Sequence, residues 1–135
     1  MAFIFIAHII QRLKISSLTS VNIKYNYKRY KVIKQITFLV GLNDKDTKVQ
    51  EVNTLDAYKV VANIMATPCT IRECRGVYEH EDGTIVFETS LEVLVLDFDG
   101  TLNDKWVQDK VVAVKTTLNQ ESVVVQYAEV NSELR

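Results

Sequence analysis

The stretch TIRECRGVYEHEDGTIVFETSLEVLVLD at residues 70–97 decides the fold. Residues 70–79 and 84–97 are rich in side chains that favour β-strands, and the short segment between them ends in Asp82-Gly83. An Asp-Gly pair supplies the positive φ angles that a tight reversal of the chain requires. The sequence therefore predicts an antiparallel hairpin.

The second arm of this hairpin is long, and its alternation of apolar and polar residues becomes irregular near Ser90 and Leu91. An extra residue in one strand shifts such an alternation by one position, so we expect a bulge or bend there. The polar positions of the two arms carry opposite charges, which favours cross-strand ion pairs. The residues expected to pair are the arginines Arg72 and Arg75 with the acids Glu73, Glu79, Glu88 and Glu92.

A strand and a helix are predicted before the hairpin. Residues 36–42 form a short apolar run that is typical of a buried strand. Asn53 or Thr54 can cap the helix that follows, and Pro68 prevents it from continuing. Its apolar residues recur at helical spacing and are Leu55, Tyr58, Val61, Ala62 and Met65.

A second helix and a last strand are predicted after the hairpin. Asn103 can cap this helix, and residues 122–129 are rich in valine, which favours a strand. The apolar stripe of the helix is expected to pack on the sheet. It consists of Trp106, Val107, Val111, Val114 and Leu118.

The resulting order of elements, β-α-β-β-α-β, is that of the ferredoxin-like fold. We therefore predict an α+β domain at residues 34–135, in which two helices cover one face of a four-stranded antiparallel sheet. Residues 1–33 are predicted to be a basic N-terminal arm or extension. The apolar content of the uncovered sheet face favours a protein partner or a second copy of the chain there.

Charge is unevenly distributed along the chain. Residues 1–35 contain seven of the 16 Lys and Arg residues, and all 17 Asp and Glu residues follow them. Tyrosines between cations can stack on bases while the cations contact phosphates. The alternation of this segment also fits an edge strand, and a third interpretation is a dispensable extension from an upstream start codon. The candidate nucleic-acid contacts are Lys24, Tyr25, Tyr27, Lys28, Arg29, Tyr30 and Lys31.

The apolar run at residues 3–10 is too short to span a bilayer. In a secretory signal the positive charges precede the apolar run, whereas here Arg12 and Lys14 follow it. We therefore expect a cytoplasmic protein. Cys69 and Cys74 are too few for a disulfide framework and lack the partners of a zinc site, which predicts reduced structural thiols.

The segment LVLDFDGTL at residues 94–102 resembles the first motif of the haloacid dehalogenase superfamily, a hydrophobic strand that runs into Asp-x-Asp-Gly-Thr. In that family the first aspartate is the phosphoryl-accepting nucleophile, the second is a general acid and base, and Mg²⁺ binds beside them. The resemblance implies these roles for Asp97 and Asp99. Such chemistry also needs cations that neutralise the phosphoryl charge.

The chain after this motif is too short to supply those partners. Only 34 residues follow Thr101, enough for one helix and one strand. We therefore interpret the segment as a strand-to-helix turn, in which Gly100 takes a positive φ and Asp97 and Asp99 solvate the reversal. This interpretation predicts no catalytic residue and no cofactor, with Mg²⁺ at the two aspartates as the alternative. His80 is interpreted as a solvated turn residue rather than a metal ligand.

The strand that ends in Gly41-Leu42, together with the Gly76-Val77-Tyr78 step of the hairpin, resembles small ferredoxin-like proteins of the DUF3574 type. This resemblance implies the fold and no particular activity. Our first expectation is a non-enzymatic binding or interaction protein, a homo-oligomer encoded by a phage or mobile element. The alternatives are a magnesium-dependent phosphohydrolase that uses Asp97 and Asp99, and a nucleic-acid-binding protein that uses the basic arm.

Overall fold

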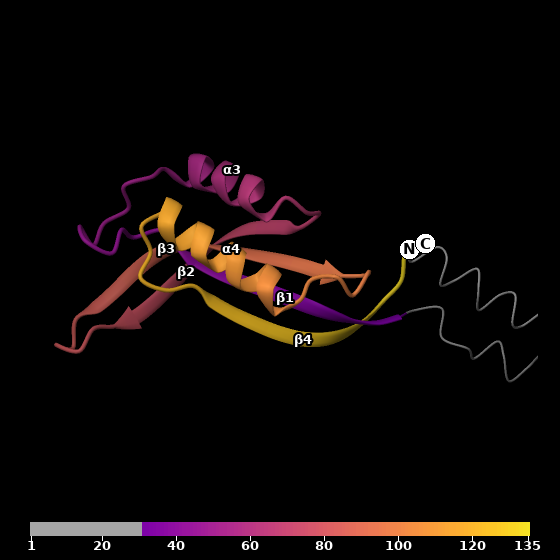
Figure 1. Cartoon of the computed structure of the whole chain (residues 1–135). Helices are drawn as coiled ribbons and strands as arrows, with labels where there is room; N and C mark the ends of the chain where they lie inside the picture. The colour runs from indigo at the N-terminus through magenta and orange to yellow at the C-terminus, as the bar shows by residue number, and fades with distance from the viewer. Residues whose placement is uncertain (1–30) are drawn as a thin grey trace, which may run out of the picture.

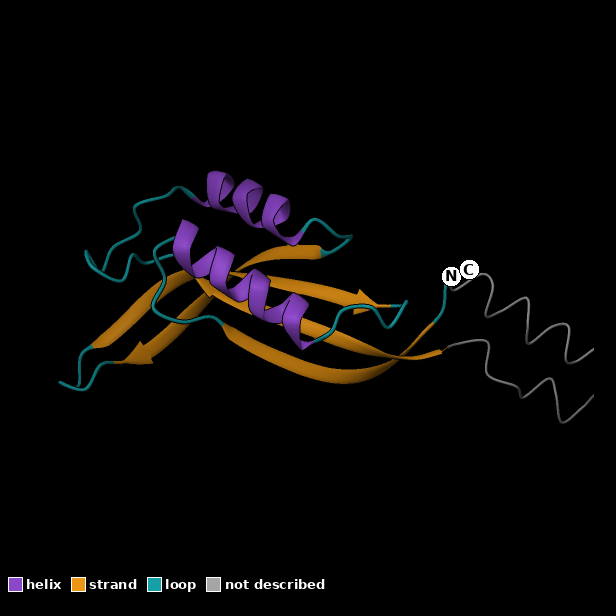
Figure 2. Ribbon diagram, viewed as in Figure 1, coloured by secondary structure: helices purple, strands orange, loops and turns teal. Residues whose placement is uncertain are grey.

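The structure, a computed structural model, describes residues 31–135. Its elements in chain order are β1 (Lys31–Gly41), α3 (Thr54–Met65), β2 (Thr70–Glu79), β3 (Ile85–Asp97), α4 (Asp104–Thr117) and β4 (Val124–Ser132). The strands lie in the order β2-β3-β1-β4, and each neighbouring pair is antiparallel. Figures 1 and 2 show both helices over the same face of the sheet. The described residues thus form the predicted ferredoxin-like α+β fold.

Both helices begin at the predicted caps. The Asn53 side chain accepts a hydrogen bond from the Asp56 N–H at 2.8 Å, and the Asn103 side chain accepts one from the Trp106 N–H at 2.9 Å. Each bond satisfies a backbone donor that has no partner within the first helical turn. After α3 the chain turns through Ala66, whose φ is 50°. These local devices explain why the sequence alone placed the helices.

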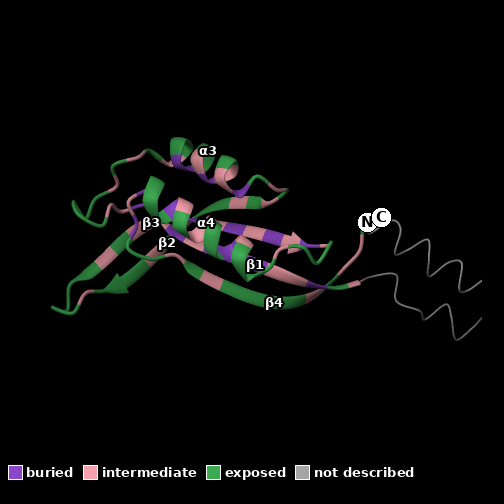
Figure 3. Ribbon diagram, viewed as in Figure 1, coloured by how far each residue is buried: buried purple, intermediate pink, exposed green. Residues whose placement is uncertain are grey.

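The core lies between the two helices and the central strands β1 and β3. Both central strands have neighbours on each side, and their residues beneath the helices are buried (Figure 3). The largest fully buried side chains are Phe38, Ile36, Met65, Leu91, Val40, Val61, Val93, Val95 and Val114. One part of the predicted helix stripe is wrong. Leu55 and Tyr58 are exposed, because α3 turns the face of Ala57, Val61 and Met65 to the sheet.

The predicted hairpin is present, and of the predicted bulge or bend the register excludes the bulge. β2 and β3 pair without interruption from Thr70↔Leu94 to Glu79↔Ile85. The reversal closes through the His80 N–H, which donates to the Thr84 carbonyl at 2.8 Å, and Gly83 has a φ of 85°. The hairpin extends beyond the helices, so Phe87 has the same orientation as Leu91 yet is 76% exposed (Figure 1).

The start of β1 is held against the turn that follows β3. The Lys31 ammonium donates to the Phe98 carbonyl at 3.0 Å, and the Lys34 ammonium donates to the Leu102 carbonyl at 2.7 Å. Lys31 is thus part of the sheet, while the other candidate nucleic-acid contacts lie outside the described residues. These are Lys24, Tyr25, Tyr27, Lys28, Arg29 and Tyr30. Within residues 31–135, neither helix has the length and apolar character needed to cross a membrane.

Candidate active site

The Asp-x-Asp-Gly-Thr segment forms the turn between β3 and α4. Asp97 is 6% exposed on the helix-covered face, and its carboxylate accepts the N–H groups of Thr101 at 3.1 Å and Leu102 at 3.3 Å. Gly100 has a φ of 68°, as a turn glycine requires. Asp99 is exposed, so the two carboxylates lie in different surroundings. Within residues 31–135 no group of three His, Cys, Asp or Glu side chains is placed to hold a metal ion.

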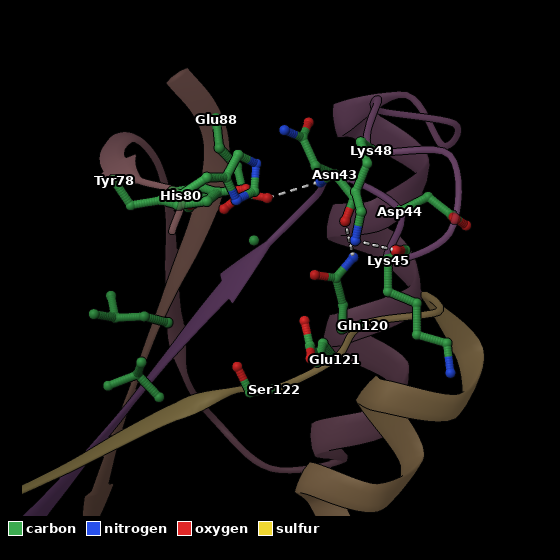
Figure 4. A pocket seen from close by; sticks show the side chains of 14 residues that line it. Asn43, Asp44, Lys45, Lys48, Tyr78, His80, Glu88, Gln120, Glu121 and Ser122 are labelled. Carbon is green, nitrogen blue, oxygen red and sulfur yellow. Dashed lines mark hydrogen bonds between the residues drawn. The ribbon is translucent and has the colours of Figure 1, made fainter. Parts of the chain in front are cut away.

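A cavity of about 430 Å³ lies at the opposite end of β3, and we call it the Glu88 cavity (Figure 4). It is bounded by the end of β1, by the hairpin of β2 and β3, and by the segment that leads into β4. Its strand residues point away from the helices, because Val40 and Leu91 point toward them and side chains alternate along a strand. The cavity therefore opens on the sheet face that the helices leave uncovered.

Glu88 is held in this cavity by the end of β1. Its Oε2 accepts a hydrogen bond from the Asn43 backbone N–H at 3.0 Å. A Cβ atom added to Gly41 would lie 2.5 Å from Glu88 Oε1, so only a glycine leaves room for this carboxylate. The sheet register causes the approach, because Ser90 pairs with Gly41 and Glu88 lies two residues further along the same face.

This position corrects the sequence interpretation of Glu88. It was expected to join cross-strand ion pairs, but its carboxylate lies over Gly41 of the next strand. The expected pairing does occur four residues further along β3, where Arg72 and Glu92 form an ion pair at 2.8 Å. Charge alternation along the hairpin could not distinguish these two acids. The one available signal was a glycine that ends a buried strand, directly before the polar segment that begins at Asn43.

Asn43 is itself fixed from the other side by the segment that follows α4. The buried Gln120 side chain donates to the Asn43 carbonyl at 2.9 Å and to the Leu118 carbonyl at 3.1 Å. Asn119, with a φ of 49°, donates to the carboxylates of Asp44 and Asp46, each at 2.9 Å. The backbone that holds Glu88 is therefore part of a hydrogen-bonded corner rather than a free loop.

The pKa of Asp44 is lowered by the same contacts. The Asn119 side-chain amide contributes most, followed by the backbone N–H groups of Thr47 and Asp46, all of which stabilise the ionised carboxylate. Asp44 lies at the surface, and its ionised carboxylate holds the loop at residues 43–50 in place through these hydrogen bonds. The loop is closed by an isolated bridge between Asn43 and Gln50.

The rings of Tyr78 and His80 lie on the hairpin side of the Glu88 cavity, edge to face with centroids 5.3 Å apart (Figure 4). Tyr78 is 41% exposed, so part of its side chain is accessible there. His80 belongs to the predicted turn, and it also borders the cavity, which the sequence did not indicate. The cysteines lie elsewhere: both are free and half-buried, and burial raises the pKa of the Cys69 thiol.

Lys48 lies across the cavity from Glu88. Its ammonium donates to the Lys45 carbonyl at 2.6 Å, and its side chain turns toward Asn43 and Gln120 (Figure 4). The Glu88 cavity thus has the Glu88 carboxylate on one wall, the Lys48 ammonium on another and the Tyr78 ring on its hairpin side. Its lining also includes the charged residues Asp44, Lys45 and Glu121. Such a site matches a small ligand that carries both signs of charge and a flat ring.

Comparison with known proteins finds relatives at the level of structure. No family model matches the chain, and no curated protein matches it. A phage SAM lyase in complex with S-methyl-5'-thioadenosine has a TM-score of 0.52 and 24% identity, over 74% of this chain and 90% of that chain. A phage SAM lyase in the apo state has a TM-score of 0.54 and 25% identity, over 76% of this chain and 86% of that chain.

These neighbours correct our first expectation. They are enzymes, which points to a catalytic role, and the expectation of a non-enzymatic binding protein is therefore wrong. The two alternatives, a phosphohydrolase at Asp97 and Asp99 and a nucleic-acid-binding arm, gain no support from them. Both neighbours are phage proteins, in line with the expected phage or mobile-element origin. The homo-oligomer, the cytoplasmic location, the absence of a cofactor and the DUF3574 resemblance stay predictions.

Proposed function

We propose that this protein is a lyase that cleaves S-adenosylmethionine and releases S-methyl-5'-thioadenosine. The observation that carries the proposal is the similarity to phage SAM lyases over about three quarters of the chain. The Glu88 cavity is the proposed site of the reaction. It has a size suited to a small molecule, and its walls offer the charges and the ring that such a substrate would contact.

The product defines which bond breaks. S-methyl-5'-thioadenosine keeps the methyl group and the adenosyl group on sulfur, so the bond between sulfur and Cγ of the methionine portion is cleaved. Sulfur takes both electrons of that bond and becomes a neutral thioether. An oxygen of the substrate's own carboxylate forms the new bond to Cγ, which gives homoserine lactone as the second product. Atoms and charges balance without water, a metal ion or a redox partner.

This reaction needs positioning more than it needs a strong acid or base. The attacking oxygen and Cγ belong to one molecule, and the rate depends on how often the chain folds so that they meet in line with the leaving sulfur. The reaction also removes one negative and one positive charge, so a site that excludes water favours it. A cavity built on paired strands provides fixed positions for the groups that hold the substrate.

Glu88 is the residue that we assign to the cationic part of the substrate. A carboxylate can accept about four hydrogen bonds, so the single Asn43 N–H leaves Glu88 able to bind a further donor. Its negative charge suits the substrate ammonium or the sulfonium. Tyr78 offers the ring on which the adenine would stack.

The direct test incubates the purified full chain with S-adenosylmethionine and measures both products by liquid chromatography and mass spectrometry. We expect S-methyl-5'-thioadenosine and homoserine lactone in equal amounts. Glu88→Gln keeps the shape and removes the charge, and it should lower kcat/KM about 10- to 100-fold, the value of a charge-assisted hydrogen bond.

Glu92→Gln is the matched control, because Glu92 lies on the same strand and face and pairs with Arg72 at the surface. This control should retain wild-type activity. Folded wild-type protein that forms neither product would refute the lyase. Full activity in Glu88→Gln would instead support the lyase function but show that Glu88 is not part of its active site.

A further inference from the structure

Lys48 has an unusual backbone conformation for a residue with a long side chain. Its φ is 64°, in the left-handed region. The loop around it enforces this geometry: the Lys48 N–H donates to the Asp44 carbonyl at 2.9 Å, and the Asp44 N–H donates to the Val49 carbonyl at 2.8 Å. The Asp44 carboxylate also accepts the N–H groups of Asp46 and Thr47. The direction in which the Lys48 side chain leaves the backbone is therefore set by the fold.

The Lys48 ammonium is also held at its far end. One of its three donors is used by the Lys45 carbonyl at 2.6 Å, and a lysine ammonium accepts no hydrogen bond in return. The remaining donors can bind an anion at the wall of the Glu88 cavity. Figure 4 shows Lys48 turned toward Asn43 and Gln120, whereas Lys45 runs away from them.

We propose that Lys48 binds the carboxylate of the substrate's methionine portion, opposite the Glu88 carboxylate that takes its cationic part. This inference rests on the proposed lyase function and adds the direction in which the methionine portion of the substrate binds. The methionine portion carries an ammonium and a carboxylate on one carbon, and a site with a single charge would match only one of them. Opposite charges on two walls match both the ammonium and the carboxylate, so the methionine portion can bind in one direction only.

The assignment separates ligands that are otherwise alike. S-adenosylmethionine and S-adenosylhomocysteine carry the carboxylate, whereas S-methyl-5'-thioadenosine lacks it. Loss of the Lys48 charge should therefore weaken the first two ligands and leave the third unaffected. A residue that only shapes the loop would alter the binding of all three.

The experiment uses the full chain and the variant Lys48→Met, which keeps an unbranched side chain as far as the ε position and removes the ammonium. Isothermal titration with S-adenosylhomocysteine should show a Kd about tenfold higher than for wild type, and KM for S-adenosylmethionine should rise by a similar factor. The Kd for S-methyl-5'-thioadenosine should stay within about twofold. Lys48→Arg should restore most of the affinity, because it keeps the charge.

Lys59→Met is the matched control, because Lys59 is an exposed residue of α3 on the other side of the sheet. It should behave as wild type throughout. Lys48→Asn serves as a second uncharged variant, since asparagine tolerates a positive φ. Thermal unfolding of each variant shows whether the fold is retained.

The outcomes distinguish the two proposals. If wild type cleaves S-adenosylmethionine but Lys48→Met and Lys48→Asn bind S-adenosylhomocysteine as wild type does, the lyase stands and the Lys48 assignment fails. An equal loss of affinity for all ligands would also overturn it, because that pattern indicates a structural role. Wild-type protein that neither binds nor cleaves S-adenosylmethionine would overturn both.

Discussion

Asp97 and Glu88 are two acids of one strand, β3, and the fold uses them differently. Asp97 points toward the helices, is buried and accepts two backbone N–H groups of its own turn. Glu88 points to the uncovered face and lies in a cavity, held by the N–H of Asn43 just after β1. The acid with the recognisable motif has a structural role in the turn, while the acid without a motif faces the space where a ligand fits. A catalytic motif therefore means little until the rest of its constellation is found.

Replacing Asp97 tests the structural side of this comparison and should have the largest effect. Asp97→Ala leaves two backbone N–H groups without their acceptor beneath the turn, which should lower the free energy of unfolding by about 3 kcal/mol. Urea denaturation measures the loss. Lyase activity per folded molecule should not change, and a decrease in activity beyond the loss of folded protein would show that Asp97 acts in the site.

Replacing Gly41 tests the functional side. In Gly41→Ala the added Cβ would lie 2.5 Å from Glu88 Oε1, and the flexible carboxylate can move away at little cost in stability. We expect kcat/KM for S-adenosylmethionine to fall about tenfold, which corresponds to about 1.4 kcal/mol, with nearly unchanged thermal unfolding. Combined with Glu88→Gln, the Gly41 change should add little, because both act on the same carboxylate.

Gly76→Ala is the control for this prediction. Gly76 lies on β2 opposite Glu88 in the register, and its added Cβ would meet Ser90 Oγ at 3.6 Å and the Glu88 carbonyl oxygen at 3.9 Å, both ordinary contacts. Activity should therefore remain at the wild-type level. If Gly41→Ala is as active as wild type, Glu88 does not need its observed position.

The smallest expected effect concerns Asp44, which clamps the loop beside the Glu88 cavity. Its pKa is lowered in the folded protein, chiefly by the Asn119 amide, so its contribution to stability is fully present above the unfolded pKa of about 3.9 and is lost as the pH falls through the folded value. Wild type should be slightly more stable than Asp44→Asn at pH 6. Denaturation midpoints should show this difference shrinking below pH 4, and a difference that grows there would contradict the assignment.

Local signals along the chain were sufficient to predict the elements and their order. The Asn53 and Asn103 caps, the Asp82-Gly83 reversal and the bounds of β2 can be read from neighbouring residues, because caps and tight turns are made by side chains within a few positions of each other. The strand-to-helix turn after β3 was also predicted from neighbouring residues, and Gly100 has the expected positive φ there.

Only the tertiary structure decided where the cavity lies and which acid faces it. Asn43 and Glu88 are 45 residues apart, and the sheet register alone brings them within a hydrogen bond of each other. Phe87 and Leu91 share one strand face, and only the extent of the helices makes one exposed and the other buried. Contacts between distant segments depend on which strands pair and on how far the helices cover the sheet, and a single sequence records neither.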